Sequence, residues 1–168
     1  MGRYRPPQPR SSPYITRDGY EMLQAEDKAL WLRRRGVTKA LAAAAAEGDR
    51  SENAEYIYRK KELREIDRRI RYLQKRMPDL KIVERVPDNQ DQVFFGAWVT
   101  LEDAAGCEVT YRIVGADELD ADQGWISLDS PLAKALLKRQ VDDEVQVQTP
   151  SGVRRYIIVE VRYSAQTT

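Results

Sequence analysis

Residues 42–56 read AAAAAEGDRSENAEY, and they separate two stretches that each carry a helical pattern of apolar residues. The alanine run strongly favours helix, whereas residues 47–53, called the tip segment below, are rich in turn and capping residues. The first pattern starts after Thr16, a suitable helix N-cap, and comprises Tyr20, Leu23, Leu30, Val37, Leu41 and Ala44. The second ends at Pro78 and comprises Tyr56, Leu63, Ile66, Ile70, Leu73 and Met77. Two helices with one apolar stripe each, joined by a tight turn, predict an antiparallel coiled-coil hairpin over residues 14–79.

Beyond a polar linker at residues 80–92, the apolar pattern changes from a helical period to alternation. The expected strands cover residues 93–101, 109–113, 145–147 and 156–163, the last with an irregularity in register before Val161. Ser130 followed by Pro131 predicts the start of a short helix over residues 132–137. We therefore expect an α+β protein, in which a hairpin precedes a small, mostly antiparallel α+β domain over residues 93–168.

The first 13 residues hold four prolines and three arginines but no acid, which predicts a disordered basic leader. Whether the leader has a role of its own stays open. The remaining sequence has no apolar run of the roughly 20 residues that a membrane span requires, and its N-terminus lacks the apolar core of a signal peptide. We expect a cytoplasmic protein that has no membrane partner.

Composition restricts the chemistry that the chain could perform. It contains no histidine, which removes nucleophile pairs with histidine, histidine acid–base catalysis and most transition-metal sites. Its lone cysteine, Cys107, cannot form an internal disulfide. Any reaction must therefore depend on carboxylates, lysine or tyrosine, or on the active site of a partner.

The second predicted helix separates its charges. Five cations fall within a sector of about 80° at 100° per residue, roughly opposite the apolar stripe. This set, called the basic stripe below, comprises Lys60, Arg64, Arg68, Arg71 and Lys75. It is compatible with a merely solubilising surface, but its single sign favours a face for phosphates or acids.

The tip segment carries two carboxylates three residues apart, Asp49 and Glu52. This spacing fits a capping box, in which both acids would serve only the start of the second helix. The alternative is that both act as oxygen ligands for Mg²⁺. Two carboxylates alone bind Mg²⁺ weakly, and the chain offers no second acidic cluster for a two-metal site. The second interpretation therefore implies half of an active site, which a partner completes.

Several segments in the same order resemble the GreA/GreB family of bacterial transcript cleavage factors. Residues 48–56 are similar to the tip motif of the family, and residues 60–73 resemble the second hairpin helix of its GreB branch. Further similar segments lie at residues 93–99, 112–115, 126–131 and 149–152. The resemblance covers residues 13–163.

The resemblance implies that the C-terminal domain is FKBP-like and docks at the rim of the secondary channel of bacterial RNA polymerase. The coiled coil would pass through the channel to the polymerase active site. There, Asp49 and Glu52 would be the catalytic pair and would share a Mg²⁺ ion with polymerase, which itself cuts backtracked RNA. The basic stripe would guide the nascent RNA 3′ end or contact the channel wall. The protein would then be no enzyme, would hold no cofactor of its own and would act as a monomer.

Two other functions stay open at this point. A protein of the same shape could bind the secondary channel and inhibit transcription. An FKBP-like folding helper would need an apolar pocket lined by aromatic rings, whereas all the aromatic residues of the domain could belong to its core. These residues are Phe94, Phe95, Trp98, Tyr111, Trp125, Tyr156 and Tyr163.

Overall fold

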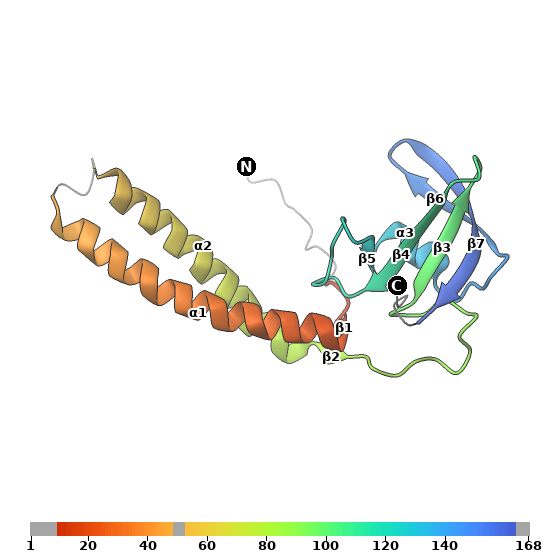
Figure 1. Cartoon of the computed structure of the whole chain (residues 1–168), viewed down its shortest axis with the longest axis horizontal. Coiled ribbons are helices and arrows are strands. Elements are labelled where there is room, and N and C mark those ends of the chain that lie inside the picture. Colours follow the sequence, from red (N-terminus) through yellow and green to blue (C-terminus); the bar gives the residue numbers. More distant parts are fainter. Residues whose placement is uncertain (1–9, 49–52, 164–168) are drawn as a thin grey trace, which may run out of the picture. The chain divides into compact units, whose positions relative to one another are not determined.

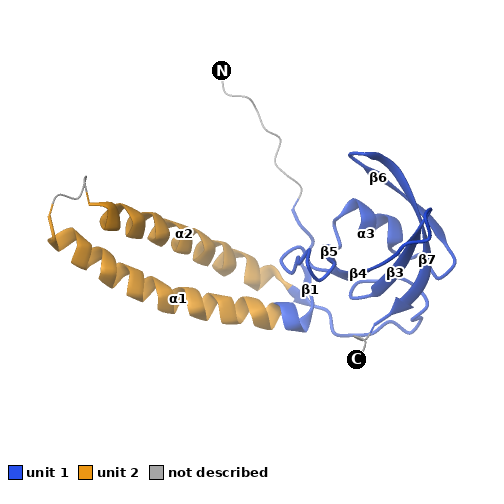
Figure 2. Cartoon of the chain, turned by 45° about the horizontal axis from the view of Figure 1, so that its top comes forward, with its two compact units in different colours: residues 1–19, 81–168 blue, residues 20–80 orange. Residues whose placement is uncertain are grey.

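The computed structural model describes residues 10–48 and 53–163. The chain divides into two compact units, residues 1–19 with 81–168 (unit 1) and residues 20–80 (unit 2) (Figure 2). Helices α1 (Arg17–Ala46) and α2 (Ala54–Arg76) form a hairpin, and a 3-10 turn, Met77–Asp79, follows α2 (Figure 1). The described elements of unit 1 are β1 (Tyr14–Ile15), β2 (Lys81–Ile82), β3 (Trp98–Asp103), β4 (Glu108–Val114), β5 (Trp125–Ser127), α3 (Pro131–Leu136), β6 (Glu144–Thr149) and β7 (Gly152–Arg162).

The two predicted apolar stripes meet along the hairpin. Val37 of α1 packs with Ile66 and Ile70 of α2, and all three are at most 4% exposed. Ion pairs flank this seam, joining Arg33 to Glu62, Arg34 to Asp67 and Glu26 to Arg69. Glu26 lies beside Arg69, whereas Ala44, 18 positions later along α1, lies beside Asn53 just before α2, so the helices are antiparallel. The predicted hairpin is confirmed, and α1 continues through Gly36 without a break.

The main sheet of unit 1 has the strand order β5-β4-β3-β7-β6, and only the β4–β5 pair is parallel. The α+β class and the mostly antiparallel sheet are therefore confirmed. The register between β3 and β7 shifts between Thr100 and Leu101, which confirms the predicted irregularity before Val161. The strand predicted from residue 93 is wrong in its first half, because Gly96 adopts a φ of +85° and β3 begins only at Trp98.

One face of this sheet carries the core of unit 1. The fully buried side chains of Val99, Leu101 and Ile113 pack with Ala133 and Leu136 of α3. Successive strand residues point to opposite faces, so their neighbours lie on the other face of the sheet. Trp98 precedes Val99, and Trp125 precedes Ile126, which also packs against this core, so both tryptophans lie on the other face. The expectation that all the aromatic residues could be core is wrong for these two.

A buried carboxylate joins the first turn of α1 to the loop after β4. Glu118 is 7% exposed, and it accepts hydrogen bonds from the backbone N–H groups of Thr16 (3.0 Å) and Gly115 (2.7 Å) and from the Thr16 hydroxyl. The same hydroxyl accepts from the Gly19 N–H at 3.1 Å, which confirms Thr16 as the N-cap of α1. Space is tight here, since a Cβ at Gly115 would lie 2.2 Å from the Tyr14 carbonyl oxygen.

Replacing Glu118 with alanine is expected to lower the free energy of unfolding by about 2–5 kcal/mol. Each backbone donor left buried without an acceptor costs about 1–3 kcal/mol, and Glu118 serves two such donors. Urea denaturation would measure the loss, with the exposed Glu108→Ala as a control that changes stability by less than about 0.5 kcal/mol. An unchanged free energy of unfolding in Glu118→Ala would show that water replaces the carboxylate.

Ser12, which we expected in the disordered leader, donates to Asp129 from its N–H (2.8 Å) and from its hydroxyl (2.5 Å). The Pro13 carbonyl accepts from Lys81 at 2.8 Å beside the short β1–β2 pair. Residues 1–9, the rest of the expected leader, lie outside the described residues.

No helix in the described ranges combines the length and the apolar character that crossing a membrane would require.

Candidate functional site

The two ends of the hairpin turn are joined by one side chain, that of Asn53. Its Oδ1 accepts from the Tyr56 N–H at 3.1 Å, which makes Asn53 the N-cap of α2. Its Nδ2 donates to the Ala44 carbonyl at 2.9 Å, close to the C-terminus of α1. Asn53 therefore satisfies one free donor of α2 and gives the Ala44 carbonyl, which also accepts from the Glu47 N–H at 3.3 Å, a second donor.

Asp49 and Glu52 themselves lie outside the described residues. The position that caps α2 is nevertheless occupied by Asn53, so the capping-box interpretation of the two acids is wrong. Sequence reasoning missed Asn53, although Asn immediately before a helical pattern is a recognised N-cap. The role of Asp49 and Glu52 as metal ligands stays a prediction.

All five residues of the basic stripe lie on α2 with exposed side chains. Within the described part of the chain, none of the five forms an ion pair. Lys60 stands over the ring of Tyr56 at 5.7 Å, and Arg71 donates to the Asp67 carbonyl at 3.2 Å. These five charges therefore remain available for an external anion.

Other arginines of the hairpin differ from the basic stripe because carboxylates hold them. Arg69 binds Glu26 through two hydrogen bonds of 2.6 and 2.8 Å. Arg33 and Arg59 both contact Glu62, and the Arg33 hydrogen bond is the main reason that the pKa of Glu62 lies below its ordinary value. The sequence alone does not separate the two classes of arginine, because Arg33 and Arg69 each bind a carboxylate of the opposite helix, Glu62 and Glu26.

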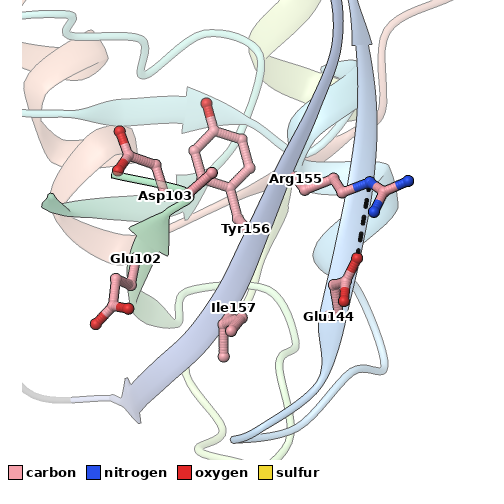
Figure 3. Close-up of a pocket in the computed structure, with 7 residues that line it drawn as sticks. Glu102, Asp103, Glu144, Arg155, Tyr156 and Ile157 are labelled. Atoms are coloured by element: carbon pink, nitrogen blue, oxygen red, sulfur yellow. Dashed lines mark ion pairs between the residues drawn. The ribbon is translucent and has the colours of Figure 1, made fainter. Parts of the chain in front are cut away.

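A hollow with a volume of about 190 Å³ is lined by residues of β3, β6 and β7 (Figure 3). Tyr156 is the one aromatic residue among those that line it, and Glu144 and Arg155 form an ion pair of 3.9 Å at its edge. Glu102 and Asp103 add two further carboxylates. This charged lining differs from the apolar, aromatic pocket that a proline-binding folding helper needs, so nothing at this hollow supports that function.

The fold and the tip define a class of protein: a long two-helix hairpin, with a turn that carries carboxylates, combined with a small α+β unit. The family model described as "Transcription elongation factor, N-terminal" matches residues 13–82. The model described as "Transcription elongation factor, GreA/GreB, C-term" matches residues 87–163. The chain belongs to the GreA/GreB family of transcription elongation factors.

Relatives in this family match the chain along nearly all of its length. The transcription elongation factor GreB of Xanthomonas axonopodis pv. citri (strain 306) is 56% identical over 167 residues, which cover 98% of this chain and 99% of the relative. GreB of Pseudomonas aeruginosa is 54% identical over 164 residues, covering 97% and 98%. Among solved structures, GreA factor homolog 1 of Thermus thermophilus is 27% identical with a TM-score of 0.41, covering 89% of this chain and 97% of that protein.

Proposed function

We propose that this protein binds bacterial RNA polymerase, reaches the active site through the secondary channel and stimulates polymerase to cleave backtracked RNA. In this proposal the protein is a cytoplasmic monomer, and the cleavage reaction belongs to polymerase. Residues 93–168 dock at the channel rim, and the hairpin carries the tip segment inward. Asp49 and Glu52 act at the reacting phosphodiester.

The observation that carries the proposal is the capping of α2 by Asn53. A helix has one N-cap position, so α2 does not require Asp49 or Glu52 at its start. In this proposal Asp49 and Glu52 serve a partner instead of the start of α2. Full-length relatives named GreB support the same assignment.

The donor set fits an ion that is shared with polymerase. Two carboxylates supply fewer oxygen ligands than Mg²⁺ requires, so polymerase would provide the remaining ones. When bound, the ion supplies Lewis-acid stabilisation of the phosphoryl oxygens and lowers the pKa of a bound water. Asp49 and Glu52 would bind at the open side of that ion and orient the attacking water, while the basic stripe would bind phosphates of the extruded RNA.

A stalled, backtracked polymerase complex with 3′-labelled RNA and Mg²⁺ tests the proposal. The protein is expected to release short 3′ fragments and to restore elongation, because cleavage leaves a new 3′ end in the active site. Slower elongation without released fragments would contradict the proposal and would identify a channel inhibitor. Release of fragments by the protein without polymerase would contradict the assignment of the reaction to polymerase.

A further inference from the structure

A row of four side chains crosses the face of the sheet that lies opposite α3. Arg162, Trp98, Arg112 and Trp125 come from four adjacent strands and are direct cross-strand neighbours. The guanidinium of Arg162 lies 5.1 Å from the Trp98 ring, and that of Arg112 lies 5.3 Å from Trp98 and 5.0 Å from Trp125. Two indole rings therefore contact the guanidinium of Arg112 and restrict its orientation.

Arg112 has hydrogen-bonding capacity that the described residues do not use. Its side chain forms no ion pair and no hydrogen bond within that part of the chain, and its Nε is buried without a partner. The neighbouring Nε1 of Trp125 is in the same state. A guanidinium offers five N–H donors, and buried donors in folded proteins are normally satisfied. Because Nε is buried, an acceptor from outside the chain would bind the terminal N–H groups of this guanidinium, which the described residues also leave unused.

Arg112 also lines a cleft with a volume of about 250 Å³. Val83, Val86 and Phe95 form an apolar part of its lining. The other cations of the cleft are already neutralised by carboxylates, since Arg17 pairs with Glu84 and Arg85 pairs with Asp88. Among the described residues that line the cleft, Arg112 is thus the cation that lacks a carboxylate partner.

The hydroxyl of Tyr163, on another wall of the cleft, is committed within the chain. It donates to the Gln92 carbonyl at 2.5 Å and accepts from the Phe94 N–H at 2.9 Å. Burial raises the pKa of Tyr163 above its ordinary value, so this hydroxyl stays neutral and does not compete for an anion. The group of the cleft that can donate hydrogen bonds to an external anion is therefore the guanidinium of Arg112.

We propose that Arg112 and its cleft receive an acidic side chain of RNA polymerase, with an apolar neighbour of that acid packed on Val83, Val86 and Phe95. This inference rests on the proposed function, which makes polymerase the partner. Arginine held by stacking presents a planar fork that matches a carboxylate, and less conformational freedom is lost when it binds. The cleft volume suits one or two side chains and is small for a ligand of nucleotide size.

The other end of the same sheet face favours a protein over RNA. Glu102 and Glu108 are direct cross-strand neighbours there, and Ile157 separates Glu102 from Glu144 across β7. Four residues along β3, about 14 Å, separate this acidic row from Trp98. An RNA strand along the face would bring phosphates next to three carboxylates, whereas a single polymerase acid at Arg112 avoids them.

Competition binding tests the proposal with the full-length protein. Wild-type protein labelled at its exposed cysteine, Cys107, is bound to polymerase and displaced by unlabelled variants. Arg112→Gln is expected to bind at least about tenfold more weakly, because a hydrogen-bonded charge is lost. Arg112→Lys keeps the charge but loses the planar, two-pronged guanidinium. Its affinity should lie between those of the wild type and Arg112→Gln. The control Arg154→Gln removes an exposed charge from β7 and should change affinity less than about twofold.

The maximal cleavage rate at saturating Arg112→Gln should equal that of the wild type, because the tip segment is unchanged. Equal affinity of Arg112→Gln and wild type would overturn the proposal, as would equal losses in Arg112→Gln and Arg154→Gln. Loss of binding to a short single-stranded RNA, with polymerase affinity kept, would identify an RNA surface and also overturn it. If thermal unfolding shows that Arg112→Gln is misfolded, Arg112→Lys decides by the same criterion. Wild-type protein that binds polymerase without causing cleavage would refute the proposed function and leave this comparison valid.

Discussion

The double substitution Asp49→Asn and Glu52→Gln is expected to lower the maximal rate of stimulated RNA cleavage by at least about a hundredfold. Both amides keep the size of the side chain but lose the negative charge that a Mg²⁺ ligand needs. Affinity for polymerase should stay the same, because the proposed docking surface lies outside the tip segment. Single-turnover cleavage at saturating protein, measured beside competition binding, separates the two quantities.

Glu47→Gln is the matched control for this experiment, because Glu47 is an exposed carboxylate of the same tip segment. It should change the maximal rate by less than about twofold, as expected for an exposed charge outside the metal site. The hairpin itself should be unaffected in the double variant, since Asn53 caps α2. If polymerase binding is lost together with cleavage, Asp49 and Glu52 have a structural role and their catalytic assignment is wrong.

The second large effect is expected when the basic stripe is neutralised by five glutamine substitutions. Cleavage of RNA extruded over many nucleotides should fall by about tenfold or more, because each lost phosphate contact weakens binding and reduces its salt dependence. Cleavage of RNA backtracked by only a few nucleotides should fall less, since such RNA reaches fewer of the five cations. Cleavage rates against RNA length and against salt concentration provide the measurement.

Two adjacent arginines allow a sharper comparison. Arg68 is exposed and belongs to the basic stripe, whereas Arg69 binds Glu26 on α1 and lies 5.2 Å from the ring of Tyr72. Arg68→Gln should reduce cleavage of long extruded RNA, and Arg69→Gln should mainly reduce the thermal stability of the hairpin. An equal loss for long and short RNA in Arg68→Gln would leave the basic stripe without a guiding role.

The hairpin could be predicted from the sequence because its information is local. Apolar residues every three or four positions specify one face of a helix, and Leu23, Val37, Ile66 and Leu73 are buried as that pattern requires. The start of α1 at Thr16 and the start of α3 at Ser130 followed from capping preferences that act within one turn. The family resemblance likewise rests on short segments that occur in order.

The strands were harder to place. β5 has only three residues, and β1 and β2 have two each, so none of them produces a clear alternation. The backbone turn at Gly96 interrupted an apolar run that resembled a strand. In each case a long-range partner or a local backbone conformation outweighed the pattern of residue types.

By itself, the sequence determined the class of the protein: a capped helical hairpin with acids in its tip segment and cations on one face of α2, followed along the chain by an α+β unit. Only the tertiary structure decided which side chains are already satisfied. It brought Glu118 to Thr16 across 102 positions, paired Arg69 but not Arg68 with an acid of the other helix, and placed Arg112 between two tryptophans of neighbouring strands. Helical periodicity and capping act over a few residues, whereas the partner of a charge is set by the register of distant strands and helices, which residue types alone do not specify.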